Sequence, residues 1–216
     1  LLRVPHWDVP PGIVAGLIGP NGAGKTTLLE TLAGFEAKNA GRLEVFGLDP
    51  WKHPVSVRTR LGFMSDDMPV FALRVDRLIR FVAGHYRSWD EQLAGELIDR
   101  FRIDTRKKAQ NLSRGEGTRL RLLLAMGFRP RLLLLDEPAL GLDLAGRRAL
   151  LETVLELVAD PSCSVVISSH QLHDVERIAD RLLALDGGSV TAEGETTELV
   201  GDHQTLEEAL TSWARG

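Results

Sequence analysis

The stretch of sequence that decides the fold reads Gly19-Pro20-Asn21-Gly22-Ala23-Gly24-Lys25-Thr26-Thr27. It matches the pattern G-x-x-x-x-G-K-[ST], in which a glycine-rich backbone surrounds phosphate groups. The apolar run of residues 13–18 before it predicts a buried strand, and residues 26–35 after it carry leucines at helical spacing. Inward-pointing N–H groups of such a loop and the N-terminal dipole of the next helix both favour an anion. We therefore expect a nucleotide-phosphate site rather than an ordinary glycine-rich turn, with Lys25 on the β- and γ-phosphates and the Thr26 hydroxyl on Mg²⁺.

Composition limits the class of protein. The chain has 216 residues, 44% hydrophobic and 26% charged, with a formal net charge of −4. This length favours one domain with a smaller appendage, and the acidic balance argues against a general nucleic-acid-binding surface. The single cysteine, Cys163, excludes an internal disulfide and indicates a reducing compartment. We expect neither a membrane span nor a signal peptide, and because the chain lacks an initiator Met we expect a natural N-terminal piece to be missing.

Outside the loop, short apolar runs alternate with helical patterns. The runs that predict strands are residues 42–47, 60–65, 132–136 and 165–168. The patterns that predict helices are residues 143–158, residues 170–181 and a short amphipathic tail from Thr205. Residues 182–185 and 190–192 flank a glycine turn and predict a hairpin. This alternation predicts an α/β fold with a mostly parallel sheet, on which Trp7 is expected to pack, with stacking on an adenine as the alternative.

Residues 68–128 have a different character, because helical patterns dominate them. The segment Ser88-Trp89-Asp90-Glu91 fits a capping box at the start of one helix. A second capping box, Ser113-Arg114-Gly115-Glu116, predicts a helix that ends near Met126. We therefore expect an α/β core made of residues 1–67 and 129–216, with residues 68–128 inserted as a helical subdomain.

Three polar residues follow the predicted strands at positions suited to catalysis. Asp136 and Glu137 come after the apolar run 132–135, and His170 comes after the run 165–168. Because the carboxyl ends of parallel strands meet at one edge of a sheet, all three are expected beside the phosphate loop. Asp136 would hold Mg²⁺, Glu137 would orient the attacking water, and His170 would contact the γ-phosphate and the carboxylate base. Taken alone, an acidic pair after a strand is common, and a lone His is more often a surface or capping residue; His6, His53, His85, His173 and His203 are assigned to the surface or the core.

The helix start at Ser113 offers a second anion site. A serine N-cap followed by the small Gly115 leaves helix N–H groups accessible, although the plain alternative is an ordinary helix cap. Two anion sites on one chain favour an arrangement in which two subunits close on one nucleotide.

With these motifs the chain resembles the nucleotide-binding subunit of ATP-binding cassette (ABC) transporters over nearly its whole length. Residues 19–26 correspond to the Walker A motif, residues 132–136 to Walker B and Glu137 to the catalytic glutamate. Residues 112–116 correspond to the signature motif, Gly141-Leu142-Asp143 to the D-loop, and His170 to the switch histidine. The resemblance implies a P-loop NTPase core of the RecA-like type that binds ATP and Mg²⁺, with Glu137, His170 and Lys25 as catalytic residues. It also implies nucleotide contacts from the whole 19–27 stretch and from Ser113, Gly115 and Asp143.

The resemblance further implies a head-to-tail dimer, either with a second copy or with a paralogous cassette. Each of two ATP molecules would lie between the phosphate loop of one subunit and Ser113 of the other. Hydrolysis would then drive transmembrane permease subunits that dock near the helical subdomain. The implied location is cytoplasmic, on the inner face of the cell membrane, and no nucleic acid is expected as a partner.

The chain departs from the family pattern at three places. Asp66 stands where the family has the Q-loop glutamine, and a carboxylate there could still bind Mg²⁺ or its water. Arg114 replaces a signature glycine, and its cation could reach phosphate, reach an acidic partner or lie solvated. Such basic variants, with Trp89-Asp90, resemble the exporter branch of bacterial cassettes. The aromatic residue that stacks on adenine in the family normally lies upstream of Leu1, so we expect weaker nucleotide binding.

Two other functions are compatible with a phosphate loop. A non-transport cassette ATPase of the translation or DNA-repair kind usually carries two cassettes or a long coiled-coil insertion, and neither is present in this sequence. A P-loop GTPase should show an Asn-Lys-x-Asp motif, which is absent, and a small-molecule kinase would not explain Ser113 or His170. The sequence therefore favours the ATPase subunit of a transporter, with export as the expected direction.

Overall fold

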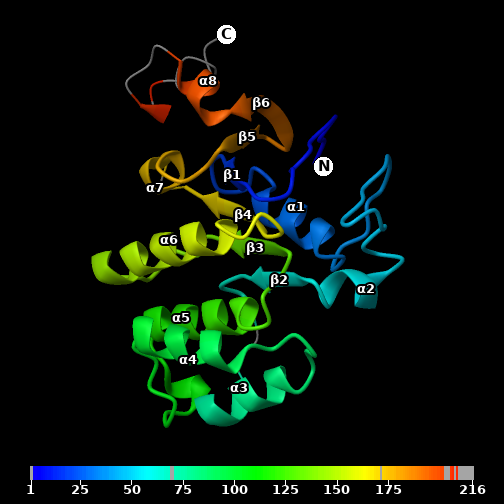
Figure 1. The fold of residues 1–216 in the computed structure, drawn as a ribbon. Coiled ribbons are helices and arrows are strands. Elements are labelled where there is room, and N and C mark those ends of the chain that lie inside the picture. Colours follow the sequence, from blue (N-terminus) through cyan, green and yellow to red (C-terminus); the bar gives the residue numbers. More distant parts are fainter. Residues whose placement is uncertain (1, 69–70, 171, 202–204, 207, 209–216) are drawn as a thin grey trace.

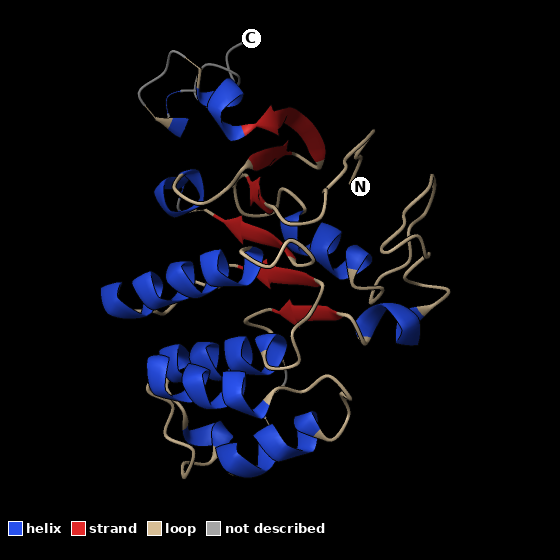
Figure 2. Ribbon diagram, viewed as in Figure 1, coloured by secondary structure: helices blue, strands red, loops and turns tan. Residues whose placement is uncertain are grey.

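The structure is a computed structural model that describes residues 2–68, 71–170, 172–201, 205–206 and 208. His203 lies outside these ranges, and so does most of the amphipathic helix expected from Thr205. The described part is an α/β structure in which helices lie on both faces of one twisted sheet (Figures 1 and 2). This confirms the fold class expected from the alternating pattern.

The sheet has six strands in the order β2-β3-β4-β1-β5-β6. Every neighbouring pair is parallel except β5 and β6, which form an antiparallel hairpin. The strands are β1 Val14–Ile18, β2 Leu61–Met64, β3 Leu132–Asp136, β4 Ser164–Ser169, β5 Arg181–Asp186 and β6 Ser189–Glu195. The strand that leads into the phosphate loop, β1, thus lies inside the sheet between β4 and β5.

Strand register brings the functional segments to one edge of the sheet. Ile18, the last residue of β1, is opposite Ser169 of β4, and Asp136 of β3 is opposite Ser168. Because these strands are parallel, the segments that follow them leave the sheet at the same end. The phosphate loop, Glu137 and His170 therefore begin side by side.

The apolar strands are continuous because both of their faces are covered. Leu133, Leu134 and Leu135 of β3 are fully buried. Leu133 and Leu135 belong to one core cluster and Leu134 belongs to the other, since successive side chains in a strand point to opposite faces. Burying such a leucine on either face contributes about 2 kcal/mol, so the strand is favoured only between two helical layers.

Different helices supply these two layers. Helix α1 (Lys25–Leu32) and the short α2 (Pro54–Arg58) place Leu28, Leu29 and Val57 in the cluster that holds Leu134. Helices α6 (Leu144–Val158) and α7 (Leu172–Glu176) pack on the opposite face, and α8 (Thr196–Val200) follows β6. Across the described ranges, no helix combines the length and apolar character of a membrane span.

The remaining helices gather beside the edge strand β2 (Figure 1). They are α3 Val75–Ala83, α4 Glu91–Arg100, the short 3₁₀ helix η1 Ala109–Asn111 and α5 Arg114–Met126. Helix α5 lies directly against β2, because a Cβ built on Gly62 would be 2.3 Å from the carbonyl oxygen of Ala125. Leu97 and Leu120 from this group share one buried cluster with Leu133 of the sheet, so the core is continuous.

Two element predictions were wrong. Residues 42–47 form no strand; only an isolated bridge joins Val45 to Leu48, because Phe46 and Gly47 both adopt left-handed conformations and turn the chain back. The helix expected over residues 170–181 is restricted to Leu172–Glu176. The chain leaves the helix because Asp180 pairs with β1, its N–H donating to the Val14 carbonyl and its carboxylate accepting from the Val14 N–H.

The N-cap expected at Ser88 was also wrong, because the structure places it two residues later. Asp90 is the N-cap of α4, and its carboxylate accepts a hydrogen bond from the Leu93 N–H at 2.9 Å. The Ser88 hydroxyl instead donates to the Phe128 carbonyl at 2.9 Å. The second box is confirmed, because Ser113 and Glu116 exchange both of the expected hydrogen bonds at the start of α5.

Candidate active site

The phosphate loop connects the end of β1 to the start of α1. Its glycines are required by geometry: Gly24, the N-cap of α1, has φ of 103°, and a Cβ on Gly19 would lie 2.1 Å from the Leu185 carbonyl oxygen. Among the described residues, no side chain caps α1. Its first N–H groups are therefore directed into the loop, where an anion can accept their hydrogen bonds.

Lys25 lies beneath this loop and is only 6% exposed. Its ammonium donates to the carbonyl oxygens of Gly19 at 2.8 Å and Pro20 at 3.3 Å, and it lies 3.6 Å from Oε1 of Glu137. A buried ammonium held by two carbonyls and a carboxylate has a fixed position. It is placed to offer its charge to phosphate oxygens inside the loop.

Thr26 and Asp136 form an oxygen pair beside Lys25. The Thr26 hydroxyl donates to Oδ2 of Asp136 at 2.7 Å, and the Ser168 hydroxyl donates to Oδ1 of the same carboxylate at 2.6 Å. The described residues include no cluster of three or more His, Cys, Asp or Glu suited to a metal. This donor set fits Mg²⁺, because Mg²⁺ commonly takes one or two protein oxygens and completes its shell with phosphate and water.

Glu137 and His170 meet at the same edge of the sheet. Oε2 of Glu137 lies 2.7 Å from Nδ1 of His170 and accepts from the His170 backbone N–H at 3.3 Å. Oε1 is buried and has no hydrogen-bond partner among the described residues, although it faces the Lys25 ammonium. One carboxylate oxygen thus fixes the histidine, and the other faces the Lys25 ammonium.

The start of α5 is a rigid helix N-terminus. The Ser113 hydroxyl accepts from the Glu116 N–H at 3.3 Å, and the Ser113 N–H donates to Oε2 of Glu116 at 2.9 Å. The Lys107 ammonium donates to Oε1 of Glu116 at 2.6 Å. These contacts, with Lys107 first, lower the pKa of Glu116 from 4.5 to about 2.

Asp143, which the family resemblance assigns to the D-loop, is the N-cap of α6 and joins this helix to α5. Its Oδ1 accepts hydrogen bonds at 2.9 Å from the Gly146 N–H and from the Arg119 guanidinium. Gly115 approaches the same loop so closely that a Cβ on it would lie 2.6 Å from the Gly141 carbonyl oxygen. The signature segment and the D-loop therefore pack together within one chain, although they are far apart in sequence.

Asp66 has partners other than the metal expected from the sequence. Its Oδ2 accepts two hydrogen bonds from the guanidinium of Arg114, at 3.0 and 2.7 Å, and its Oδ1 accepts one from Arg121 at 2.5 Å. Both oxygens are thus engaged by arginines of α5. The sequence left three environments for Arg114: a phosphate, an acidic partner or solvent. The structure shows an acidic partner, Asp66, within the same chain.

The structure therefore brings together Lys25, Thr26, Asp136, Glu137 and His170, and it places Ser113, Gly115 and Asp143 in a second group at the start of α5 and α6. His6, His53, His85 and His173 are exposed, as expected.

Four partners of these residues were missed from the sequence, namely Lys107, Arg119, Arg121 and Ser168. Ser168 carried a usable signal, since it is a polar residue that directly follows the apolar run of residues 165–167. Arg121 carried one too, because it interrupts a run of leucines in α5.

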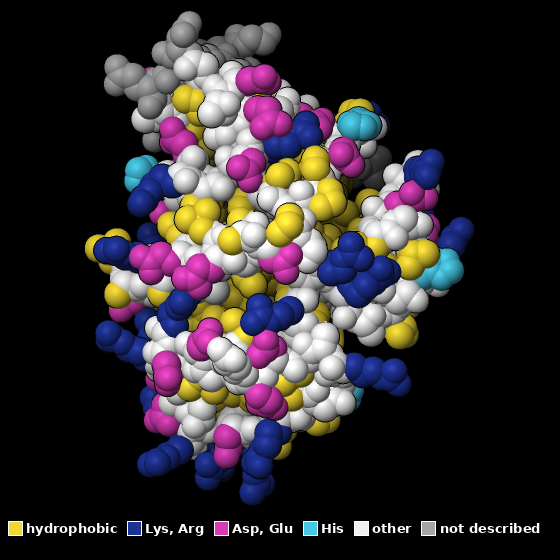
Figure 3. Space-filling model, viewed as in Figure 1, with side chains coloured by type: hydrophobic (Ala, Val, Ile, Leu, Met, Phe, Trp, Pro, Cys, Tyr) yellow, Lys and Arg dark blue, Asp and Glu magenta, His cyan; other side chains and the backbone are white. Residues whose placement is uncertain are grey.

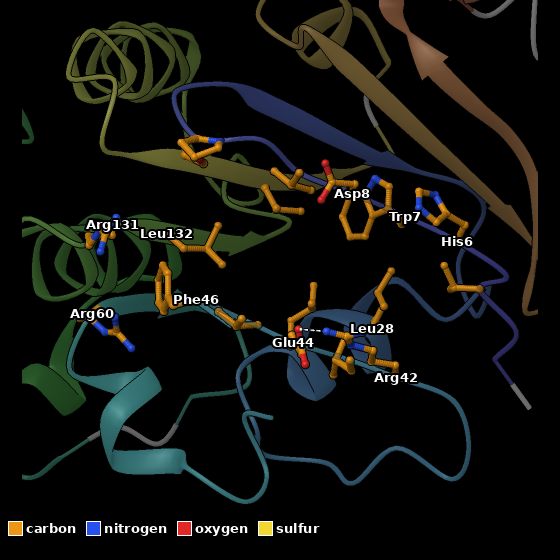
Figure 4. A pocket seen from close by; sticks show the side chains of 18 of the residues that line it. His6, Trp7, Asp8, Leu28, Arg42, Glu44, Phe46, Arg60, Arg131 and Leu132 are labelled. Carbon is orange, nitrogen blue, oxygen red and sulfur yellow. Dashed lines mark hydrogen bonds and ion pairs between the residues drawn. The ribbon is translucent and has the colours of Figure 1, made fainter. Parts of the chain in front are cut away.

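A separate cavity of about 1000 Å³ lies away from this edge. Its lining includes Leu132 and Ser164, the first residues of β3 and β4, so it opens at the end of the sheet opposite to the phosphate loop. Hydrophobic side chains gather over the sheet in the view of Figure 3, and Figure 4 shows Trp7 beside His6 and Asp8, across the cavity from Phe46. Trp7 packs on the core cluster of the sheet, as expected.

Comparison with known proteins identifies relatives over almost the whole chain. The family model described as ABC transporter matches residues 2–140. The ABC transporter ATP-binding protein YtrB of Bacillus subtilis (strain 168) is 32% identical over 211 residues, which cover 97% of this chain and 72% of that protein. The phosphate import ATP-binding protein PstB 2 of Natronomonas pharaonis is 31% identical, covering 90% and 74% respectively. The daunorubicin resistance ATP-binding protein DrrA3 of Streptomyces coeruleorubidus is 35% identical over 88% of this chain, which spans only 62% of that relative.

Solved structures share the same fold. A structure described as the ATP binding subunit of an ABC transporter has a TM-score of 0.88 and 25% identity, covering 96% of this chain and 90% of its own. A dimeric structure of the ATP-binding cassette MJ0796 bound to ADP and Pi has a TM-score of 0.79 over 90% of both chains. Because only 18% of the residues are identical, the similarity to this second structure shows a shared fold and no more.

Proposed function

Because this chain belongs to the ABC transporter family of ATP-binding ATPase subunits, we propose that it powers export across a bacterial membrane through an ATP-driven head-to-tail dimer. The observation that carries the proposal is the meeting of Lys25, Thr26, Asp136, Glu137 and His170 at one edge of the sheet. These are the groups that phosphoryl transfer to water requires: a phosphate cradle, oxygen ligands for Mg²⁺ and an oriented base.

Within the site each residue has a distinct role. The 19–27 loop and Lys25 bind the phosphates, while Thr26 and Asp136 hold Mg²⁺, which neutralises phosphate charge when it is bound. Glu137 orients the attacking water through Oε1, the oxygen without a hydrogen-bond partner among the described residues. His170 is held on Oε2 by Nδ1, so its other ring nitrogen is available to a phosphate oxygen.

The second group of residues acts on the nucleotide of another subunit. Ser113 and Gly115 begin α5, whose N-terminus favours an anion, and Asp143 begins α6 beside them. One chain therefore supplies a phosphate loop to one ATP and a signature segment to another. The MJ0796 cassette, which shares the fold, is described as a dimer bound to ADP and Pi. The partner of this chain is a second copy or a paralogous cassette, with permease subunits attached at the inner face of the membrane.

The test is the ATPase rate as a function of protein concentration. If two subunits complete each site, the rate per chain should rise with concentration and reach a plateau, because a monomer holds only half of a site. The variant Glu137→Gln should lower turnover by about a hundredfold or more and accumulate as an ATP-bound dimer in light scattering.

Glu91→Gln, which changes an exposed carboxylate at the start of α4, is the matched control and should behave as the unchanged protein. A constant rate per chain from the dilute end upward, or normal turnover by Glu137→Gln, would contradict the dimeric mechanism.

The direction of transport rests on resemblance. The relatives include a phosphate import protein and a Nod factor export protein of Rhizobium etli, so their names support both directions. Arg114 and the Trp89-Asp90 pair favour the exporter branch. Identification of the membrane protein that copurifies with the chain, followed by transport assays in vesicles with ATP on one side, would decide the direction. Copurification with ribosomes or DNA instead would favour a non-transport cassette ATPase.

A further inference from the structure

Three charged side chains outside the catalytic group form one cluster between the sheet and α5. Asp66 lies in the turn that follows β2, and Arg114 and Arg121 lie two turns apart on α5. The carboxylate bridges the two guanidiniums, with Oδ2 on Arg114 and Oδ1 on Arg121. We name these three residues the Asp66 cluster.

The two arginines differ in how deeply their side chains are buried. The Arg121 side chain is 14% exposed, whereas that of Arg114 is 56% exposed. Burial lowers the pKa of Arg121, and the neighbouring Asp66 opposes this shift. A partly buried guanidinium needs a counter-charge, so Arg121 fixes Asp66 in place. Asp66, once fixed, is a preformed partner for the more exposed Arg114.

Arg114 also reaches a third segment through its aliphatic stem. A Cβ built on Gly141 would lie 3.1 Å from Cγ and 3.2 Å from Cδ of Arg114. The stem therefore covers the D-loop, while the guanidinium at its end is held by Asp66. A single side chain thus connects the turn after β2, the start of α5 and the D-loop.

Helix electrostatics alone do not favour an arginine at this position. Arg114 is the first residue of α5, where the positive end of the helix dipole repels a cation. Arg121, two turns along the same helix, adds a second repulsion. Asp66 offsets both, since its carboxylate lies between the two guanidiniums. The orientation of Arg114 therefore depends on Asp66.

We propose that Asp66 is a positioning residue that holds Arg114, and with it the start of α5 at Ser113 and Gly115, in the orientation that receives the nucleotide of the second subunit. The proposal rests on the dimeric function proposed above. It replaces the Mg²⁺-binding role expected for Asp66, because both of its carboxylate oxygens are engaged by arginines. Loss of Asp66 should then weaken subunit association and leave the Mg²⁺ requirement of the phosphate loop unchanged.

The experiment is a double-mutant cycle with Asp66→Asn, Arg114→Gln and the combined variant. The first readout is the protein concentration at half-maximal ATPase rate, and the second is the Mg²⁺ concentration at half-maximal rate. Each single variant should raise the protein concentration at half-maximal rate by about threefold to fivefold. This is the range that the loss of a partly exposed ion pair supports. The combined variant should need no higher protein concentration for half-maximal rate than either single variant. The Mg²⁺ concentration at half-maximal rate should be the same in all of these proteins. Asp66→Glu, which keeps the charge, should recover part of the loss.

The matched control is the pair Arg74 and Asp76. It is also an exposed arginine and carboxylate joined by two hydrogen bonds at the start of a helix, α3, but it belongs to a different helix from the signature segment. Arg74→Gln and Asp76→Asn should not change either concentration. If the effects of Asp66→Asn and Arg114→Gln on the protein concentration at half-maximal rate were independent and multiplied in the combined variant, the proposal would be overturned.

Other outcomes would also overturn it. If Asp66→Asn lowered the concentration needed for activity, Asp66 would compete with association instead of supporting it. If the variant raised the Mg²⁺ requirement with association unchanged, Asp66 would act on the metal.

Amide hydrogen exchange of residues 115–118 in the nucleotide-free chain tests the cluster separately from the dimer. Exchange should be about threefold to fivefold faster in Asp66→Asn, and unchanged exchange would count against the proposal. Loss of concentration dependence in the unchanged protein, with this exchange effect intact, would reject the dimer and not the cluster.

Discussion

The Glu116 carboxylate lies between the Lys107 ammonium and the Ser113 N–H, both of which favour its charged form. Its pKa in the folded chain is about 2, compared with 4.5 for the free side chain. The unfolded chain therefore binds a proton at Glu116 at a higher pH than the folded chain does. The stabilisation that Glu116 supplies is complete above about pH 4.5 and is lost as the pH falls toward 2.

We expect Glu116→Gln to lower the free energy of unfolding by about 1 kcal/mol at neutral pH, because the amide keeps the capping geometry but loses the ion pair. The difference between the two proteins should shrink between pH 5 and pH 2. Urea denaturation at a series of pH values checks this, with the exposed Glu91→Gln as the control. A difference that stays constant with pH would mean that the charge of Glu116 does not stabilise the fold.

For single residues, the sequence predicted those side-chain interactions whose partners are close in sequence. The capping box at Ser113 was predictable because both of its partners lie within one turn. The box at Ser88 was wrong because the serine hydroxyl is bound by Phe128, a residue from another element. The partners of Asp66 were unpredictable for the same reason, since they lie on a helix that begins 48 residues later. Side-chain pairing across elements depends on packing that no local pattern contains.

Among the elements, α5 and β2 are in close backbone contact. A Cβ on Gly62 would lie 2.3 Å from the Ala125 carbonyl oxygen and 2.8 Å from Cδ1 of Leu133. We expect Gly62→Ala to lower the free energy of unfolding by about 1–3 kcal/mol, because helix and strand would have to separate. Urea denaturation measures the change, and the ATPase rate should fall as α5 shifts.

Gly95→Ala serves as the control for this substitution. Gly95 lies on the exposed side of α4, and apart from its chain neighbours and the nearby backbone of its own helix no atom lies within 4 Å of the added Cβ. Alanine there should raise the free energy of unfolding by about 0.5–1 kcal/mol, since glycine is a poor helix residue. Equal effects at the two glycines would show that α5 tolerates displacement from β2.

Elements with a strong apolar period were predictable, and those decided by one distant contact were not. Strand β3 and helix α5 are as expected because burial of their leucines favours one conformation. Helix α7 is shorter than expected because Asp180 binds Val14 of β1. The turn at Phe46 and Gly47 depends on two positive φ angles, one of them in a residue that rarely adopts them.

For the whole molecule, one buried cluster connects the sheet with the helices of residues 68–128. It contains Leu97 and Leu120 from the helices and Leu133 and Val165 from the strands. We propose that residues 68–128 form a subdomain of the 1–67 and 129–216 core and expect both to unfold in a single cooperative transition.

Two tryptophans report on the two regions, Trp89 at the start of α4 and Trp7 on the sheet. In single-tryptophan variants that keep Trp7 or Trp89 and replace the other three of the four tryptophans, urea unfolding followed by fluorescence should give the same midpoint. Circular dichroism of both variants supplies the control for the global transition. Separate midpoints would show that the helices unfold independently of the sheet.

The position of the active site within the molecule followed from topology. Parallel strands present their carboxyl ends at one edge, so the phosphate loop, Glu137 and His170 were predictable as neighbours. The position of the signature segment was not, because the side of the sheet that an insertion packs against is set by close contacts such as Gly62 on Ala125. The sequence thus predicted that Lys25, Glu137 and His170 meet, whereas the packing of α5 beside β2 required the structure.

Glu137 has a backbone φ of 48°, a left-handed conformation that glycine or asparagine adopts more readily than glutamate. Holding a glutamate there costs about 1 kcal/mol or more, and burying Oε1 without a hydrogen-bond partner among the described residues adds to this cost. Selection for thermal stability alone would therefore tend to remove this residue. Laboratory evolution or consensus design aimed at a more robust cassette should keep position 137 fixed, because the most stable sequence and the most active one are expected to differ there.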